Sequence, residues 1–323
     1  MKKKTLTILI LIMLVLVAAS LAWILHRGSN DNAAHDQRSA QNEDVSQQED
    51  VQKKAEEAAA EKEKAENSAV ASHVYSHRGS EGPEEHSFKA YDAAIEAGSR
   101  YIEQDVVMSS DGVLYVSHDL NAVTMTGYNG MYEYISSETI DGLRTEAGNK
   151  VLRLSEVFDR YGKDINYVIE LKDNSDKCIL AFEEMVDEYG LSDVITVSSM
   201  KADTLEVIEI KYPDMPKLFV CWNQGDFNYV IDQPYVDIVS VRSTVETGIF
   251  TESNCKAAHE AGKKFSVWTI DTEDEIKKAI DMGVDTYYTN DTALALSIEK
   301  DYGLKVRSGI DTSEEESEED KED

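Results

Sequence analysis

Cysteine is scarce in this 323-residue chain, and its few positions argue against two kinds of architecture. Three cysteines occur, at Cys178, Cys221 and Cys255, and none of them belongs to a CxxC or CxH pair. An odd count at such wide spacing argues against a disulfide framework and against a zinc site. We therefore interpret all three as ordinary small residues of the core or the surface.

Positive charge is also in short supply. The chain has 32 lysines and arginines against 63 acidic residues, which gives a formal net charge of −31 at pH 7. A surface this negative repels phosphate backbones, so the sequence predicts no nucleic-acid partner. The sequence also points to no particular protein partner. A small phosphodiester substrate can still bind where a metal cation and a few basic groups lie in one cleft.

Charged residues are missing from one long stretch near the N-terminus, Leu6–Leu25. At 1.5 Å per residue this helix would span about 30 Å, the thickness of a bilayer's hydrocarbon core. The lysines at positions 2–4 predict that the N-terminus stays inside the cell. We predict that residues 1–27 form a single-pass anchor in the cell membrane, with the rest of the chain extracellular. The alternative is a signal peptide cleaved near Ala18-Ala19-Ser20, which would give a secreted protein.

Apolar periodicity is missing from the segments that flank the middle of the chain. Residues 28–71 are polar and net acidic, and residues 52–66 have high helix propensity without an apolar face. They predict a solvated, partly helical linker. The acidic residues 303–323 predict a disordered tail. This leaves residues 72–302 as one domain, a length that suits a single α/β barrel.

A glycine-rich GxGxxG loop is absent after the first predicted strand, which argues against a doubly wound open sheet. Apolar β-rich segments instead alternate with helical patterns throughout residues 72–302. We predict helices at 87–97, 177–189, 202–211, 252–261 and 272–282. We predict strands at 73–76, 101–107, 166–171, 194–198, 217–221, 237–241, 263–269 and 285–289. This alternation is typical of an α/β fold of the (β/α)₈ TIM-barrel type.

Charged residues recur at the same spacing at two successive predicted strands. Glu103 and Asp105 are two residues apart, so their side chains share one face, and their apolar neighbours place that face inside the barrel. Two unpaired carboxylates buried together are unfavourable, and a bound Mg²⁺ or Ca²⁺ would relieve that cost. Glu170 and Lys172 repeat the spacing, which favours Glu170 as a third ligand and Lys172 as a phosphate contact.

Two of the seven histidines, His77 and His118, precede a charged residue. His77 follows the predicted strand 73–76, and His118 follows a further short apolar-rich run, Leu114–Ser117. Active sites of β/α barrels gather at the carboxyl ends of strands. A histidine pair near a metal site suits a general base and a general acid. Arg78 is interpreted as a bidentate phosphate clamp. Asp119 either orients His118 or caps a turn.

Together these residues resemble the pattern of the glycerophosphodiester phosphodiesterase family. The matching motifs are His77-Arg78-Gly79, Pro83-Glu84, Glu103-x-Asp105, Asp111-Gly112, His118-Asp119, Glu170-Leu171-Lys172 and Val267-Trp268-Thr269. Two departures stand out: Glu85-His86-Ser87 replaces the family's usual Asn-Thr after Pro-Glu, and Asn290 separates Thr289 from Asp291.

The resemblance implies a TIM barrel with a defined set of site residues. It implies a divalent cation, Mg²⁺ or Ca²⁺, held by Glu103, Asp105 and Glu170. It further implies that His77 and His118 are the acid/base pair, that Arg78 and Lys172 bind phosphate, and that Glu84 and Trp268 contact substrate.

The function that the resemblance implies is metal-dependent hydrolysis of glycerophosphodiesters to glycerol 3-phosphate and an alcohol, at the outer face of the membrane. The same site would also serve a polymeric glycerophosphate or a lysophospholipid. A lipid substrate requires an apolar ridge beside the cleft, for which Tyr128, Met131, Tyr132 and Tyr134 are candidates. A catalytically inactive surface binding module is the remaining alternative. It predicts loss of key residues, all of which are present.

Overall fold

The structure is a computed structural model that describes residues 74–79 and 84–304. The predicted anchor, the linker and all but the first two residues of the predicted acidic tail lie outside these ranges. Across the described ranges, no helix is both long enough and apolar enough to cross a membrane. The anchor and its orientation therefore stay predictions.

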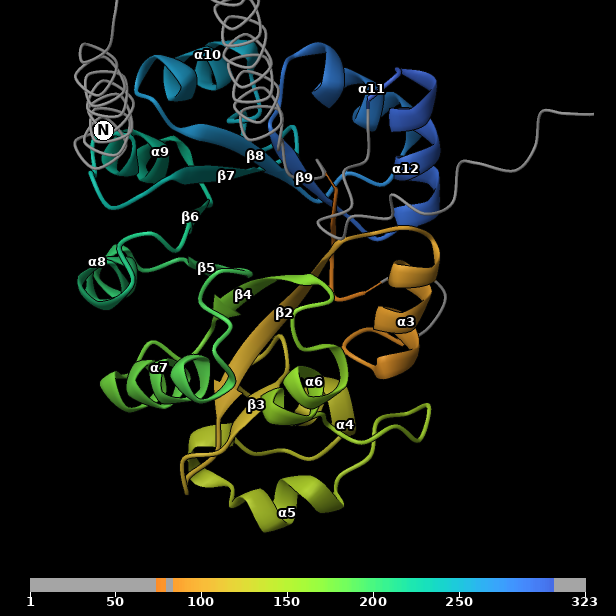
Figure 1. The fold of residues 1–323 in the computed structure, drawn as a ribbon, viewed down its shortest axis with the longest axis vertical. Helices are drawn as coiled ribbons and strands as arrows, with labels where there is room; N and C mark the ends of the chain where they lie inside the picture. The colour runs from red at the N-terminus through yellow and green to blue at the C-terminus, as the bar shows by residue number, and fades with distance from the viewer. Residues whose placement is uncertain (1–73, 80–83, 305–323) are drawn as a thin grey trace, which may run out of the picture. The chain divides into compact units, whose positions relative to one another are not determined.

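The central feature is a closed barrel of parallel strands, shown in Figure 1. Its members are β1 (Val74–Ser76), β2 (Tyr101–Met108), β4 (Asn166–Leu171), β5 (Ile195–Ser199), β6 (Lys217–Cys221), β7 (Ile238–Arg242), β8 (Lys264–Trp268) and β9 (Thr286–Thr289). Ser76 of β1 pairs with Thr289 of β9 on one side and with Ile102 of β2 on the other, which closes the ring. The TIM-barrel prediction is confirmed, and the doubly wound open sheet is wrong because β1 has a neighbour on both sides.

Helices surround this barrel in Figure 1. They are α3 (Phe88–Glu96), α7 (Asp176–Tyr189), α8 (Ala202–Lys211), α9 (Gln224–Val230), α10 (Glu252–Glu260), α11 (Glu273–Asp281) and α12 (Thr292–Asp301). Outward-facing strand residues such as Ile169 and Val197 belong to one buried cluster with helix residues such as Phe182. Because both faces of each strand are buried, the strands read as nearly continuous apolar runs. All three cysteines are free and buried, as predicted.

A short insert separates β2 from β4. It contains β3 (Leu114–Val116), which pairs antiparallel with β2, then α4 (Val123–Thr126), the 3₁₀ turn η1 (Tyr132–Tyr134), α5 (Ser137–Gly142) and α6 (Leu154–Tyr161). Val107 of β2 packs with Tyr115, Tyr132 and Ile140 in a small separate core. Tyr132 is therefore a core residue, and the prediction that it belongs to a substrate-facing ridge is wrong.

The loop between β1 and α3 brings the first sequence motif against the barrel. Ser87 caps α3 by accepting a hydrogen bond from the Ala90 amide, as its position predicts. Gly79 has φ +108°, and a Cβ there would lie 2.5 Å from the Ala90 Cβ. No residue with a side chain fits this close approach. The glycine thus lets His77 and Arg78 sit directly above α3.

Candidate active site

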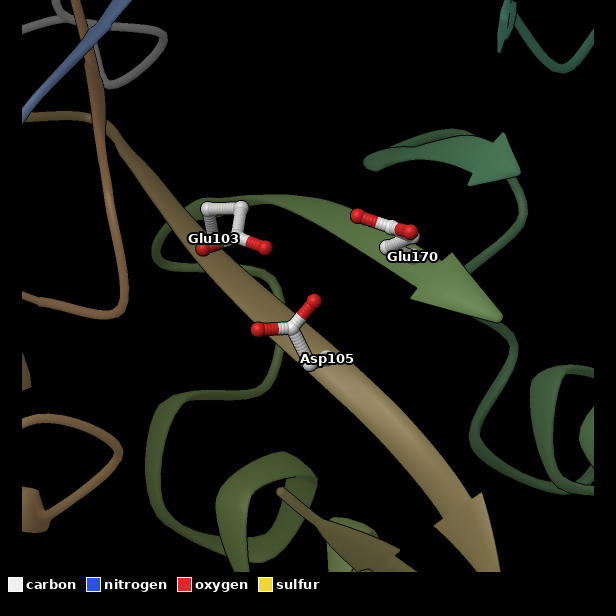
Figure 2. Close-up of side chains that lie close together, drawn as sticks. All are labelled: Glu103, Asp105 and Glu170. Carbon is white, nitrogen blue, oxygen red and sulfur yellow. The ribbon is translucent and has the colours of Figure 1, made fainter. Parts of the chain in front are cut away.

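Three carboxylates meet inside the barrel. Glu103 and Asp105 come from β2 and Glu170 comes from β4, where it pairs with Asp105 across the two strands. One ligand oxygen of each lies within 4.8 Å of the others, and Figure 2 shows the three side chains facing a common space. Glu103 and Asp105 are only 2% and 1% exposed. The structure therefore brings together all three predicted ligands.

The negative charge of this triad is not fully balanced by the protein. Burial and the neighbouring Asp105 raise the pKa of Glu103 well above its usual range, and they raise the pKa of Glu170 to about 7. Burial also opposes ionisation of Asp105, but the hydrogen bond with His86 and the charge of Lys172 hold its pKa below the usual value. Three converging carboxylates with this electrostatic strain fit a hard divalent cation, which takes oxygen ligands.

Two basic side chains border the triad. The Lys172 Nζ lies 3.0 Å from Glu170 Oε1 and 3.3 Å from Asp105 Oδ1. The Arg78 Nε lies 3.4 Å from Asp105 Oδ2, and the Arg78 backbone N–H donates to Glu103 Oε2 at 2.8 Å. Arg78 also pairs with Glu85 at 2.9 Å. Both predicted phosphate contacts therefore stand beside the predicted metal ligands.

His77 is held by an amide whose orientation is fixed. The Asn290 Nδ2 donates to Asp271 Oδ2 at 2.9 Å, so its Oδ1 is the atom that faces His77 Nδ1 at 2.8 Å. That oxygen can only accept, which places the proton on Nδ1 and leaves the Nε2 lone pair free. Burial, with the charge of Arg78, lowers the His77 pKa to about 4. The departure at Asn290 from the family motif thus has a positioning role.

His118 follows β3, which pairs antiparallel with β2. The Ser117 N–H donates to the Asp105 carbonyl at 2.9 Å, which sets the next residue beside the triad. The His118 Nδ1 lies 2.9 Å from Asp119 Oδ1, so Asp119 orients the ring. Burial lowers the pKa of His118, although the side chain is 39% exposed.

A cavity of about 720 Å³ adjoins His118 and the triad. Its lining includes His118, Glu170, Lys172, Met131, Met200 and Trp222. The indole of Trp222 meets that of Trp268 edge-on at 5.4 Å, and the Arg242 guanidinium lies 4.7 Å from the Trp222 ring. The Trp268 Nε1–H is buried and has no hydrogen-bond partner within the described ranges. Trp268 itself is not among the residues that line the cavity, so its predicted substrate contact stays a prediction.

Glu84 has a different setting. Its carboxylate accepts hydrogen bonds from the Thr145 hydroxyl at 2.5 Å and from Asn149 Nδ2 at 2.6 Å. These contacts tie the loop before α3 to the insert. Its predicted substrate contact stays a prediction, since all the hydrogen bonds that the structure gives its carboxylate come from the insert.

His86 was missed by the sequence reasoning. Its Nε2 lies 2.9 Å from Asp105 Oδ2, and the side chain is almost fully buried at 1% exposure. A signal was present in the sequence, because His86 belongs to the segment Glu85-His86-Ser87 that replaces the family's usual Asn-Thr, and it immediately precedes the helix cap Ser87. An imidazole in that position was a candidate for the site.

Known proteins are similar to this chain in sequence. The profile of the glycerophosphoryl diester phosphodiesterase family matches residues 77–294. A glycerophosphodiester phosphodiesterase of Bacillus subtilis (strain 168) is 24% identical, covering 70% of this chain and 86% of the relative. One of Caldanaerobacter subterraneus subsp. tengcongensis is 27% identical, covering 70% and 96%.

Solved structures share the fold. An Oleispira antarctica phosphodiesterase in complex with the product sn-glycerol-3-phosphate superposes with a TM-score of 0.62 at 20% identity, covering 70% of this chain and 96% of that one. Because the family profile spans more than half of the chain, this protein belongs to the glycerophosphoryl diester phosphodiesterase family.

Proposed function

We propose that this protein hydrolyses glycerophosphodiesters to glycerol 3-phosphate and an alcohol with the help of one divalent cation. The observation that carries the proposal is the buried triad Glu103, Asp105 and Glu170, bordered by Arg78 and Lys172. Family membership and the names of the relatives support the same chemistry. An inactive binding module would not need two oriented histidines beside such a triad.

The triad and the two basic side chains that border it, Arg78 and Lys172, would bind the phosphoryl group. Glu103, Asp105 and Glu170 would hold Mg²⁺ or Ca²⁺, which supplies polarisation of the phosphoryl oxygens. Lys172 and Arg78 contact the remaining oxygens, Lys172 as a point charge and Arg78 through its planar guanidinium. They thereby neutralise the charge that develops during the reaction.

The proton transfers fall to the two histidines, and we assign their order from their hydrogen-bond partners. His77 has a neutral amide behind it and a pKa of about 4, so at neutral pH its Nε2 is free to accept the proton of the nucleophile. That nucleophile is water, or the substrate's neighbouring hydroxyl, whose attack would leave a cyclic phosphate that water then opens to glycerol 3-phosphate. His118 has the Asp119 carboxylate behind it, which stabilises the protonated ring. His118 therefore donates the proton to the leaving alkoxide.

A lysophospholipid is a second candidate substrate, and one surface favours it. Leu120 and Met131 line the cavity beside His118, and Leu120, Val123 and Tyr128 of the insert are 43%, 43% and 42% exposed. This apolar strip of the insert, of which Leu120 lines the cavity, suits an acyl chain. No such feature distinguishes a polymeric glycerophosphate, which stays an alternative for the same site.

The test compares three substrates with the detergent-solubilised full chain. Glycerophosphocholine, glycerophosphoglycerol and lysophosphatidylcholine are supplied with Mg²⁺ or Ca²⁺, and phosphate-containing products are quantified. We expect cation-dependent release of glycerol 3-phosphate from the first two. If the strip binds an acyl chain, Leu120→Ser should lower turnover of the lysophospholipid and spare glycerophosphocholine. If none of the three substrates is cleaved, the proposal is contradicted.

The predicted location rests on residues outside the described ranges, and we propose that Leu6–Leu25 anchors the domain at the outer face of the cell membrane. Its support is the uncharged apolar run preceded by three lysines. Protease treatment of intact cells should release a fragment that carries the barrel, while the N-terminus stays with the membrane. A mature protein that begins near Ser20 would show that the segment is a cleaved signal peptide.

A further inference from the structure

We propose that His86 is a positioning residue that holds Asp105 in the orientation needed to ligate the divalent cation. It acts within a chain of three side chains, Tyr91, His86 and Asp105. The inference rests on the proposed function, because it assumes that Asp105 is a metal ligand. It assigns a role to the residue at which the sequence departs from the family pattern.

The backbone holds His86 in an unusual conformation. Its φ is +53°, which residues other than glycine rarely adopt. Its N–H donates to the Arg78 carbonyl at 2.9 Å, and Ser87 starts α3 immediately after it. These contacts turn the imidazole inward beneath the triad. A strained residue that is held firmly beside a reactive group is typical of a functional position.

The hydrogen bonds of His86 run in one direction. Its Nε2 lies 2.9 Å from Asp105 Oδ2, and its Nδ1 lies 3.1 Å from the Tyr91 hydroxyl. Because a carboxylate only accepts, Nε2 is the donor, and Nδ1 can then accept from Tyr91. Burial raises the pKa of Tyr91 well above its usual value, and the nearby Glu103 and Asp105 add to the shift. The phenol therefore keeps the proton that it donates.

The two carboxylate oxygens of Asp105 have different partners. Oδ2 accepts from His86 and faces Arg78 Nε at 3.4 Å, whereas Oδ1 lies on the side of Lys172, at 3.3 Å. With Oδ2 fixed, the carboxylate cannot rotate freely, and its remaining lone pairs stay directed toward the other two acids. Loss of such an outer partner typically weakens metal binding by about 10–100-fold.

Three variants of the full chain separate this role from simple packing. His86→Ala removes the donor, whereas His86→Gln places an amide N–H near the position of Nε2, and both keep the β carbon and thus the backbone strain. Ser87→Ala is the matched control, since it removes the helix cap at the next residue without touching Asp105. Mg²⁺ and Ca²⁺ are titrated calorimetrically into chelator-treated protein, and thermal unfolding is recorded without cation.

We expect His86→Ala to weaken cation binding by about 10–100-fold and His86→Gln to stay close to the wild type. Ser87→Ala should unfold at a lower temperature but bind the cation as the wild type does. Unchanged affinity in His86→Ala would overturn the inference, as would equal losses in His86→Ala and His86→Gln or an equal loss in Ser87→Ala. A wild type that binds no cation would instead overturn the proposed function, and with it the role of His86.

Discussion

Replacing Glu103 with glutamine is expected to abolish cation-dependent hydrolysis while leaving the fold intact. The amide has the size of the carboxylate, and its oxygen can still accept the Arg78 N–H that now lies 2.8 Å from Oε2. It lacks the negative charge through which a carboxylate ligand attracts a divalent cation. Because Glu103 is a direct ligand in the proposal, turnover should fall by more than the roughly 10–100-fold that loss of an outer partner costs.

Thermal unfolding supplies a second readout for Glu103→Gln. Glu103 is buried and its pKa is raised, so a neutral amide should leave the cation-free protein as stable as the wild type or more so. Added Mg²⁺ or Ca²⁺ should then stabilise the wild type and not the variant. Glu183→Gln is the matched control, because Glu183 is also a buried carboxylate but lies on α7 beside Lys211. Full cation-dependent turnover in Glu103→Gln would contradict the assigned metal site.

The two histidines should each prove essential for turnover. His77→Ala and His118→Ala are expected to lower kcat by roughly 10²–10⁴-fold, the range for loss of a general acid or base. Substrate affinity should change little, because the contacts of Arg78 and Lys172 with the phosphoryl group remain. Steady-state kinetics with glycerophosphocholine would measure both quantities. Undiminished turnover in both variants would refute catalysis at this site.

The order of the two roles is testable with a better leaving group. The nitrophenolate group of a nitrophenyl ester leaves without being protonated. Such a substrate should therefore restore turnover in His118→Ala and not in His77→Ala. The pH profile of kcat/KM should agree: activity is lost as the pH falls through about 4, where His77 takes up a proton and ceases to be a base. Rescue of neither variant would mean that both histidines position phosphate or metal.

The barrel was predictable because each of its strands has a sequence pattern that can be recognised without knowing its neighbours. Each is buried on both faces, so segments such as Lys217–Cys221 and Asn166–Leu171 read as short apolar runs with the same bounds in sequence and structure. The metal ligands were predictable for a related reason. Two carboxylates at alternate positions of a buried strand, Glu103 and Asp105, are too unfavourable to be accidental, and Glu170 and Lys172 repeat the spacing at the end of β4.

Sequence spacing did not predict the positioning residues, because their partners are distant in the chain. Asn290 supports His77 across 213 residues, and His86 supports Asp105 from a loop rather than a strand. Sequence spacing carries no information about such contacts. The short helix α9 was missed for another reason: it has seven residues, too few for an apolar period to show. Its capping residues Asn223 and Asp226 were the available signal.

The most direct test of the account follows glycerophosphocholine by phosphorus NMR in the presence of chelator-treated full-length protein. The diester resonance should stay constant until Mg²⁺ or Ca²⁺ is added, and it should then be replaced by the monoester resonance of glycerol 3-phosphate. The same addition to Glu103→Gln should leave the diester unchanged. Formation of the monoester at an equal rate before the cation is added, or in Glu103→Gln, would contradict a metal-dependent phosphodiesterase built on Glu103, Asp105 and Glu170.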